Sequence, residues 1–116
     1  MNKKTILRSA GLVLGAGAML ASAPAFALSA TTTGSKLTTS ADEGHKIARV
    51  YDTSADSRSA KGEYERQASP NEIKNLWNKS GNGTVVKSAS GSKIAKGRAC
   101  RQEQAAPDSC GGWKFN

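Results

Sequence analysis

Large apolar side chains are scarce in this chain, and this scarcity most limits what it can fold into. Burying one such side chain stabilises a fold by about 1.5–3 kcal/mol. A dozen of them barely offset the conformational entropy lost by roughly seventy ordered residues. A domain of this kind is expected to need a covalent or metal staple. The large apolar residues beyond position 44 are Ile47, Val50, Tyr51, Tyr64, Ile73, Leu76, Trp77, Val85, Val86, Ile94, Trp113 and Phe115.

The two cysteines, Cys100 and Cys110, are the candidates for that staple. Two cysteines allow one intramolecular pairing, and closing so short a loop contributes about 3 kcal/mol. The alternatives are a metal site or reactive thiols, and a metal would need further ligands. The single histidine, His45, lies far away in the sequence. We therefore predict a disulfide, and neither a metal nor another cofactor.

The N-terminal segment has the three regions of a secretory signal peptide. Basic residues around Lys3 precede an apolar run at residues 10–21, and residues 25–27 form a small-x-small cleavage site. The apolar run is shorter than the roughly 20 residues that cross a membrane. We expect residues 1–27 to be removed before Leu28. The product would be secreted into the extracellular space and would have no membrane segment.

The remaining chain is basic. The predicted signal peptide holds three of the 17 Lys and Arg residues and none of the 9 Asp and Glu residues, so the rest has a net charge of +5. Such a charge supports solubility or attraction to anionic partners. The basic residues are scattered among Ser and Gly and form no dense block, so we favour solubility and expect no nucleic-acid partner.

Residues 28–44 are rich in Thr and Ser and lack periodicity. This composition buries too little apolar surface to order itself, so we predict a flexible N-terminal extension. The extension is either a spacer or a segment that orders on a partner, because a Thr-rich chain suits an added β-strand. In the second interpretation, the partner-binding residues are Leu28, Thr31, Thr32, Thr33 and Leu37.

Residues 45–116 contain short β-favouring segments, separated by Gly, Ser and Asn turns about ten residues apart. This spacing predicts an all-β domain, a small antiparallel sheet or β-sandwich with one disulfide. The segment at 73–78 also fits a short helix, but we favour a strand. The Asn82-Gly83 turn predicts a hairpin that joins this strand to the next. The expected strands cover residues 46–52, 60–66, 73–78, 84–87, 92–101 and 111–116.

The strand predicted at residues 60–66 alternates charged residues with small or aromatic ones. This period of two indicates one buried and one solvated face. Gly62 within the strand indicates a bulge or a close approach of another backbone. Tyr64, Trp77 and Trp113 are predicted to lie in the core, because the core is thin.

The residues that catalysis requires are poorly placed in this sequence. A Ser/His/acid triad needs a positioned histidine, and His45 lies at the edge of the predicted flexible extension. A cysteine nucleophile is excluded if the two cysteines pair. Glu63 and Glu65 would have to act across a cleft, but they alternate with polar neighbours as a solvated face does. We therefore expect a protein that is not an enzyme.

Four short segments carry a resemblance to a known group of proteins. Residues 76–81 (LWNKSG), 99–101 (ACR), 107–110 (PDSC) and 112–113 (GW) resemble small secreted β-rich proteins of actinobacteria, especially Streptomyces. The resemblance covers residues 46–113. Within this group the chain is similar to the adaptor subunit of umbrella toxin particles. In that family, a β-domain with a flexible N-terminal extension joins a lectin-bearing subunit to a large repeat-rich toxin protein.

Together these features predict a secreted, non-enzymatic protein-binding module. The resemblance implies an adaptor that links the subunits of an extracellular toxin complex, with a repeat-rich toxin and a lectin subunit as partners. The alternative is a free-acting protein, either a cationic antimicrobial protein or a small secreted enzyme inhibitor. The net positive charge and the predicted disulfide fit that alternative as well.

Overall fold

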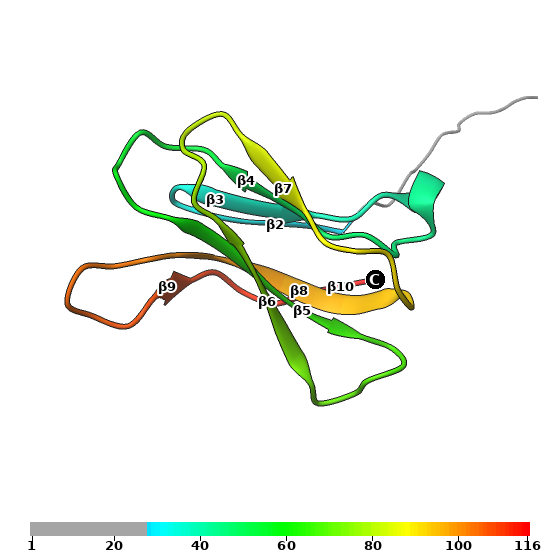
Figure 1. Cartoon of the computed structure of the whole chain (residues 1–116). Coiled ribbons are helices and arrows are strands. Elements are labelled where there is room, and N and C mark those ends of the chain that lie inside the picture. The colour runs from blue at the N-terminus through cyan, green and yellow to red at the C-terminus, as the bar shows by residue number, and fades with distance from the viewer. Residues whose placement is uncertain (1–27) are drawn as a thin grey trace, which may run out of the picture.

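A computed structural model describes residues 28–116, and the predicted signal peptide lies outside these residues. Two antiparallel sheets form two layers (Figure 1). This arrangement confirms the predicted all-β class. The only helix in the described part of the chain is a short 3-10 turn, Ala41–Glu43. None of the described segments forms a helix of the length and apolar character that crossing a membrane requires.

The two sheets draw their strands from different parts of the chain. The four-stranded sheet has the order β2 (Ser29–Thr32), β3 (Ser35–Thr38), β4 (Arg49–Asp52) and β7 (Val85–Lys87). The five-stranded sheet has the order β10 (Lys114–Phe115), β8 (Ile94–Arg101), β5 (Ala60–Arg66) and β6 (Ile73–Asn78), and β9 (Ser109–Cys110) also pairs with β8.

The core lies between the two layers. Strands β2 and β3 pack on β8, and β4 packs on β5 and β6. A Cβ atom on Gly62 would overlap the side chains of Leu37 and Val50, so the close approach at this glycine is made by side chains and not by another backbone as predicted. The apolar core residues are Leu28, Ala30, Leu37, Ala48, Val50, Ala60, Tyr64, Ile94 and Ala99, with Leu76 packed against them.

The prediction of a flexible extension over residues 28–44 is wrong. This segment forms β2 and β3, which pair as a hairpin, and β3 then pairs with β4. Leu28 is 3% exposed and Leu37 is 0% exposed. The strands are short and polar on one face, so they have little local preference for order. They are ordered because Leu28, Ala30 and Leu37 pack into a core whose other residues come later in the sequence.

The predicted hairpin at Asn82-Gly83 is also wrong, although the strand at 73–78 is confirmed. Strand β7 pairs with β4 in the opposite sheet, so the turn carries the chain from one layer to the other. Asn78 anchors this crossing and is fully buried. Its amide donates to the carbonyls of Val50 and Thr84, each at 3.0 Å, and its carbonyl accepts from the Ser80 amide at 2.9 Å.

Candidate binding surface

One side of β5 faces away from the core. Ala60, Gly62 and Tyr64 are buried, and Gly62 touches the opposite sheet. Side chains alternate along a strand, so Lys61 and Glu63 point to the other side. We call the surface on this side of the five-stranded sheet the outer face. The strand register places the following residues on it: Lys61, Glu63, Glu65, Ile73, Asn75, Trp77, Lys96, Arg98, Cys100, Cys110 and Phe115.

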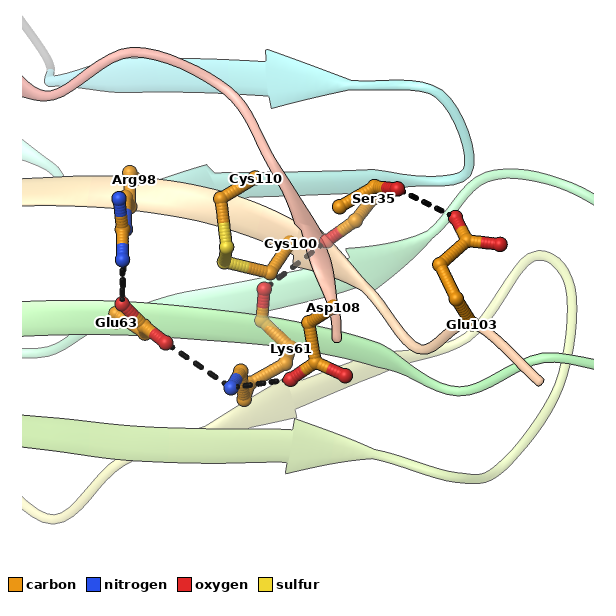
Figure 2. The surroundings of a disulfide bond; sticks show 9 residues. Ser35, Lys61, Glu63, Arg98, Cys100, Glu103, Asp108 and Cys110 are labelled. Carbon is orange, nitrogen blue, oxygen red and sulfur yellow. Dashed lines mark hydrogen bonds and ion pairs between the residues drawn. A yellow bond between two sulfur atoms is a disulfide. The ribbon is translucent and has the colours of Figure 1, made fainter. Parts of the chain in front are cut away.

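A chain of ion pairs crosses the middle of the outer face. The Lys61 ammonium lies 3.0 Å from the Glu63 carboxylate and 2.6 Å from that of Asp108 (Figure 2). Glu63 also accepts from the Arg98 guanidinium at 2.8 Å. Lys61 is only 8% exposed. The sequence predicted a solvated row of charges here, whereas the structure has a packed and fully paired network.

The pairing changes the pKa values of both central groups. Burial alone would lower the pKa of Lys61, but hydrogen bonds to Asp108 and Glu63 outweigh it and raise that pKa above its usual value. Burial would raise the pKa of Glu63, but hydrogen bonds from Lys61 and Arg98 outweigh it and lower that pKa. Both groups are therefore held in their charged forms.

We expect the Glu63 network to make the fold sensitive to acid. The lowered pKa of Glu63 adds stability above the ordinary glutamate value of 4.5, and this stability is lost as the pH falls through the lowered value. The raised pKa of Lys61 acts at the other end, where its contribution is lost only as the pH rises beyond 10.5. Urea unfolding from pH 7 to pH 2 should show a steep loss of stability below pH 4.5 in the native protein.

The matched variants for this test are Glu63→Gln and Glu72→Gln. Glu63→Gln should cost about 1–3 kcal/mol at pH 7, because it leaves charged partners without their acceptor. It should also flatten the acid limb of the profile. Glu72 pairs with Lys74 on the exposed surface, so Glu72→Gln should cost less than about 1 kcal/mol. An unchanged acid limb in Glu63→Gln would contradict the assignment.

A second cluster holds the loop between β8 and β9. Glu103 accepts from the Ser109 hydroxyl at 2.7 Å and from Arg101 at 2.9 Å, and it also pairs with Arg58. The hydrogen bonds from Ser109 and Arg101 lower the pKa of Glu103. The loop that carries Asp108 is thus tied down at both ends, which keeps Asp108 against Lys61.

Two tryptophans predicted to be core residues lie outside the core. Trp77 is on the outer face, with the ammonium groups of Lys61 and Lys79 at 5.0 Å and 5.4 Å from its ring centroid. Trp113 lies against the Lys96 ammonium at 4.7 Å and the Arg98 guanidinium at 4.6 Å. Both rings are only partly buried. Tyr64 alone of the three predicted aromatic residues is in the core.

The most exposed apolar side chain on the outer face is that of Phe115, in β10. It is 71% exposed, against 42% for Ile73 in β6. Phe115 stands opposite Lys96, whose ammonium lies 5.9 Å from its ring centroid. Together with Trp113 and Arg98, it forms what we call the aromatic patch. The patch comes from β10, the segment before it and β8, which only the C-terminal strand pairing brings together.

The predicted disulfide is present and lies on the outer face. Cys100 and Cys110 stand opposite each other on β8 and β9, with a Cα–Cα distance of 4.1 Å. Their sulfur atoms and the Glu63 carboxylate form the one potential set of three metal ligands among residues 28–116. The sulfurs are bonded to each other, so they do not act as thiolate ligands in this state.

The partner-binding residues predicted in the N-terminal segment separate into two groups. Leu28 and Leu37 are core residues, so they are not available to a partner in the folded protein. Thr31 and Thr33 are exposed, and Thr32 is partly exposed. The two leucines thus lie in the core and not on a binding surface.

His45 lies at one end of the sandwich, away from the ion pairs of the outer face. Its Nδ1 atom is 2.8 Å from the Thr39 hydroxyl oxygen, which also accepts from the Asn116 amide at 3.3 Å. His45 is partly buried. The buried Thr39 hydroxyl thus links His45 to the C-terminal Asn116.

A hollow of about 380 Å³ opens at the opposite end of the sandwich. Asp52 supplies the one carboxylate among the described residues that line it, and this carboxylate accepts from the Ser54 amide at 3.2 Å. Catalysis by a carboxylate pair requires two such groups across a cleft, so this hollow does not offer it. The outer face carries the most exposed large apolar side chain of the described residues, and we take it as the candidate functional surface.

The fold and this surface define a disulfide-linked β-sandwich with one aromatic, charge-paired face. The chain matches no known family, no curated protein and no solved structure.

Proposed function

We propose that this chain is a secreted protein-binding module that recognises another protein through the aromatic patch. The observation that carries the proposal is the 71% exposure of Phe115 beside Trp113 and Arg98. Aromatic and arginine side chains supply most of the binding energy at protein interfaces. A domain with so few large apolar residues gains no stability by leaving a phenylalanine in water. A partner that covers this residue accounts for its position.

The charge of the outer face supports a protein partner. Lys61, Lys96 and Arg98 are each paired with a carboxylate of the same face. Lys79, over the Trp77 ring, has no carboxylate partner among the described residues. Nucleic-acid binding relies on unpaired cations that neutralise phosphates, and paired cations do not serve that purpose. Protein interfaces instead combine an apolar centre with a polar rim whose hydrogen bonds are satisfied. The aromatic patch and the neighbouring ion pairs have this composition.

The proposal extends to the place and the partners of the module. A disulfide is typical of proteins that work in oxidising surroundings, which agrees with export by the predicted signal peptide. We propose that the module is an adaptor in an extracellular toxin complex, as the resemblance of residues 46–113 implies. Its partners would then be a large repeat-rich protein and a lectin subunit.

Capture of partners from culture supernatant tests this function. Tagged protein comprising residues 28–116 is incubated with supernatant of the producing strain, and the bound proteins are identified by mass spectrometry. We expect a stoichiometric partner. Phe115→Ala should weaken its binding about 30-fold, the loss of an interface residue worth about 2 kcal/mol.

Val85→Ala is the matched control, because Val85 is 47% exposed on the opposite sheet. This variant should retain the partner that Phe115→Ala loses. Recovery of the tagged protein alone would argue against a binding module. Equal retention of the partner by both variants would remove the aromatic patch from the proposal. If the captured proteins include neither a repeat-rich protein nor a lectin, only the adaptor role would be contradicted.

A further inference from the structure

Strand β6 is the longest free edge in the described sandwich. The other edge of the five-stranded sheet consists of β9 and β10, with two residues each, and β7 has three. The edge of β2 is approached by the C-terminal segment, since a Cβ atom on Gly111 would lie 2.8 Å from the Thr31 carbonyl oxygen. Strand β6 has six residues and no proline. Natural proteins usually shorten, bend or cover such edges, because they invite pairing with another strand.

The backbone groups at this edge can be assigned from the opposite side of the sheet. The Ala99 carbonyl accepts from the Gly111 amide, and the Ala95 carbonyl accepts from the Asn116 amide. The odd-numbered residues of β8 therefore direct their backbone groups toward β9 and β10. Because backbone directions alternate along a strand, the even-numbered residues of β8 bond to β5.

The same alternation continues through β5 to β6. Lys61 and Glu63 of β5 stand opposite even-numbered residues of β8, so their backbone groups bond to β8. The backbone groups of Gly62 and Tyr64, next to them in the strand, therefore point the other way and bond to β6. Their partners on β6 are Leu76 and Lys74. The N–H and C=O groups of the remaining β6 residues, Ile73, Asn75 and Trp77, therefore point to the free edge. These three residues also carry the side chains of β6 that lie on the outer face.

We propose that a second copy of this chain pairs with β6, antiparallel, with Asn75 opposite the partner's Asn75. This register places Ile73 beside the partner's Trp77 on the outer face. An aromatic side chain next to a β-branched one is a favourable cross-strand pair. The central asparagine amides can donate to and accept from each other. The edge of β6 is thus complementary to the same edge of a second copy.

The charges on β6 permit this pairing. Its one charged residue, Lys74, stands opposite the partner's Leu76 in the proposed register. The Lys74 ammonium already lies 3.0 Å from the Glu72 carboxylate, so repulsion between the two copies is reduced. The pairing joins two five-stranded sheets into one continuous sheet with two copies of the outer face on the same side. This inference goes beyond the proposed function and does not depend on the aromatic patch.

Sedimentation over a range of protein concentrations tests the dimer. A pairing of two six-residue edges is a small interface, so we expect a reversible dimer that forms as concentration rises. Asn75→Pro removes an N–H that faces the free edge and leaves the hydrogen bonds to β5 intact. It should weaken association at least tenfold. Asn75→Ala retains the N–H and should associate nearly as the native protein does.

Amide hydrogen exchange on the native protein gives a second measurement that needs no variant. The amides of Ile73, Asn75 and Trp77 should gain protection as concentration rises. Those of Lys74 and Leu76 should be protected at every concentration, because they bond to β5. A native protein that stays monomeric at millimolar concentration would overturn the proposal. Association of Asn75→Pro equal to that of Asn75→Ala would also overturn it. Phe115→Ala should dimerise normally, so failure of the partner capture and failure of dimerisation are separate results.

Discussion

Replacing Leu37 with alanine is expected to remove about 2–5 kcal/mol from the free energy of unfolding. Leu37 is 0% exposed and lies at the centre of the sandwich, against Gly62 and 2.7 Å from where a Cβ on Gly97 would lie. Both glycines belong to the opposite sheet, and they let its backbone approach this side chain closely. The cavity left by alanine is therefore bordered by backbone that cannot easily move in to fill it. Urea unfolding measured by tryptophan fluorescence reports the loss.

The control is Thr31→Ala on β2, the strand that pairs with β3 in the same hairpin. Thr31 is exposed, so this change should alter stability by less than about 0.5 kcal/mol. A small domain has only about 5 kcal/mol of total stability, so Leu37→Ala should be partly unfolded at physiological temperature. Equal unfolding midpoints for Leu37→Ala and the native protein would mean that the N-terminal hairpin is not part of the core.

Removal of the disulfide is expected to cost about 3 kcal/mol. The bond closes a loop of ten residues, and that loop gains conformational freedom in the unfolded chain when the bond is cut. The same bond holds Asp108 against Lys61, so its loss also loosens one contact of the ion-pair network. The double variant Cys100→Ala/Cys110→Ala should unfold at a lower urea concentration than the native protein. Reduction of the native protein with a dithiol should have a similar effect.

Asp108→Asn separates the two consequences of cutting the bond. This variant weakens the contact with Lys61 but keeps the loop closed, so it should cost about 1–2 kcal/mol, less than the double cysteine variant. Oxidised and reduced native protein that unfold at the same urea concentration would contradict a structural role for the bond. A loss in Asp108→Asn as large as in the double variant would place the effect in the ion pair.

The outer face was only partly predictable from the sequence. The alternation in residues 60–66 correctly separated a buried side from a charged side. It did not reveal that Glu63 is held by Lys61 and Arg98, because Arg98 belongs to a strand far away in the sequence. The tryptophans were misplaced for a related reason. The tryptophans were predicted to be core residues only because large apolar residues are few. That reason does not say which face of a strand a ring lies on.

The N-terminal hairpin and the turn at Asn82-Gly83 show how local signals fail. Both segments have composition that is typical of flexible chain or of a simple hairpin. Their actual structure depends on contacts across the sandwich. Leu37 is buried by glycines of another sheet, and Asn78 bonds a carbonyl 28 residues away. Single-strand patterns carry no information about such contacts.

The amino-acid sequence by itself determined the all-β class, most strand positions between residues 46 and 101, and the disulfide between Cys100 and Cys110. These features follow from short-range alternation, from turn residues and from the single pairing that two cysteines allow. Tertiary structure alone decided the order of residues 28–44 and the composition of the outer face. The physical reason is that burial and ion pairing depend on which distant strands meet, and no local pattern of residues encodes that meeting.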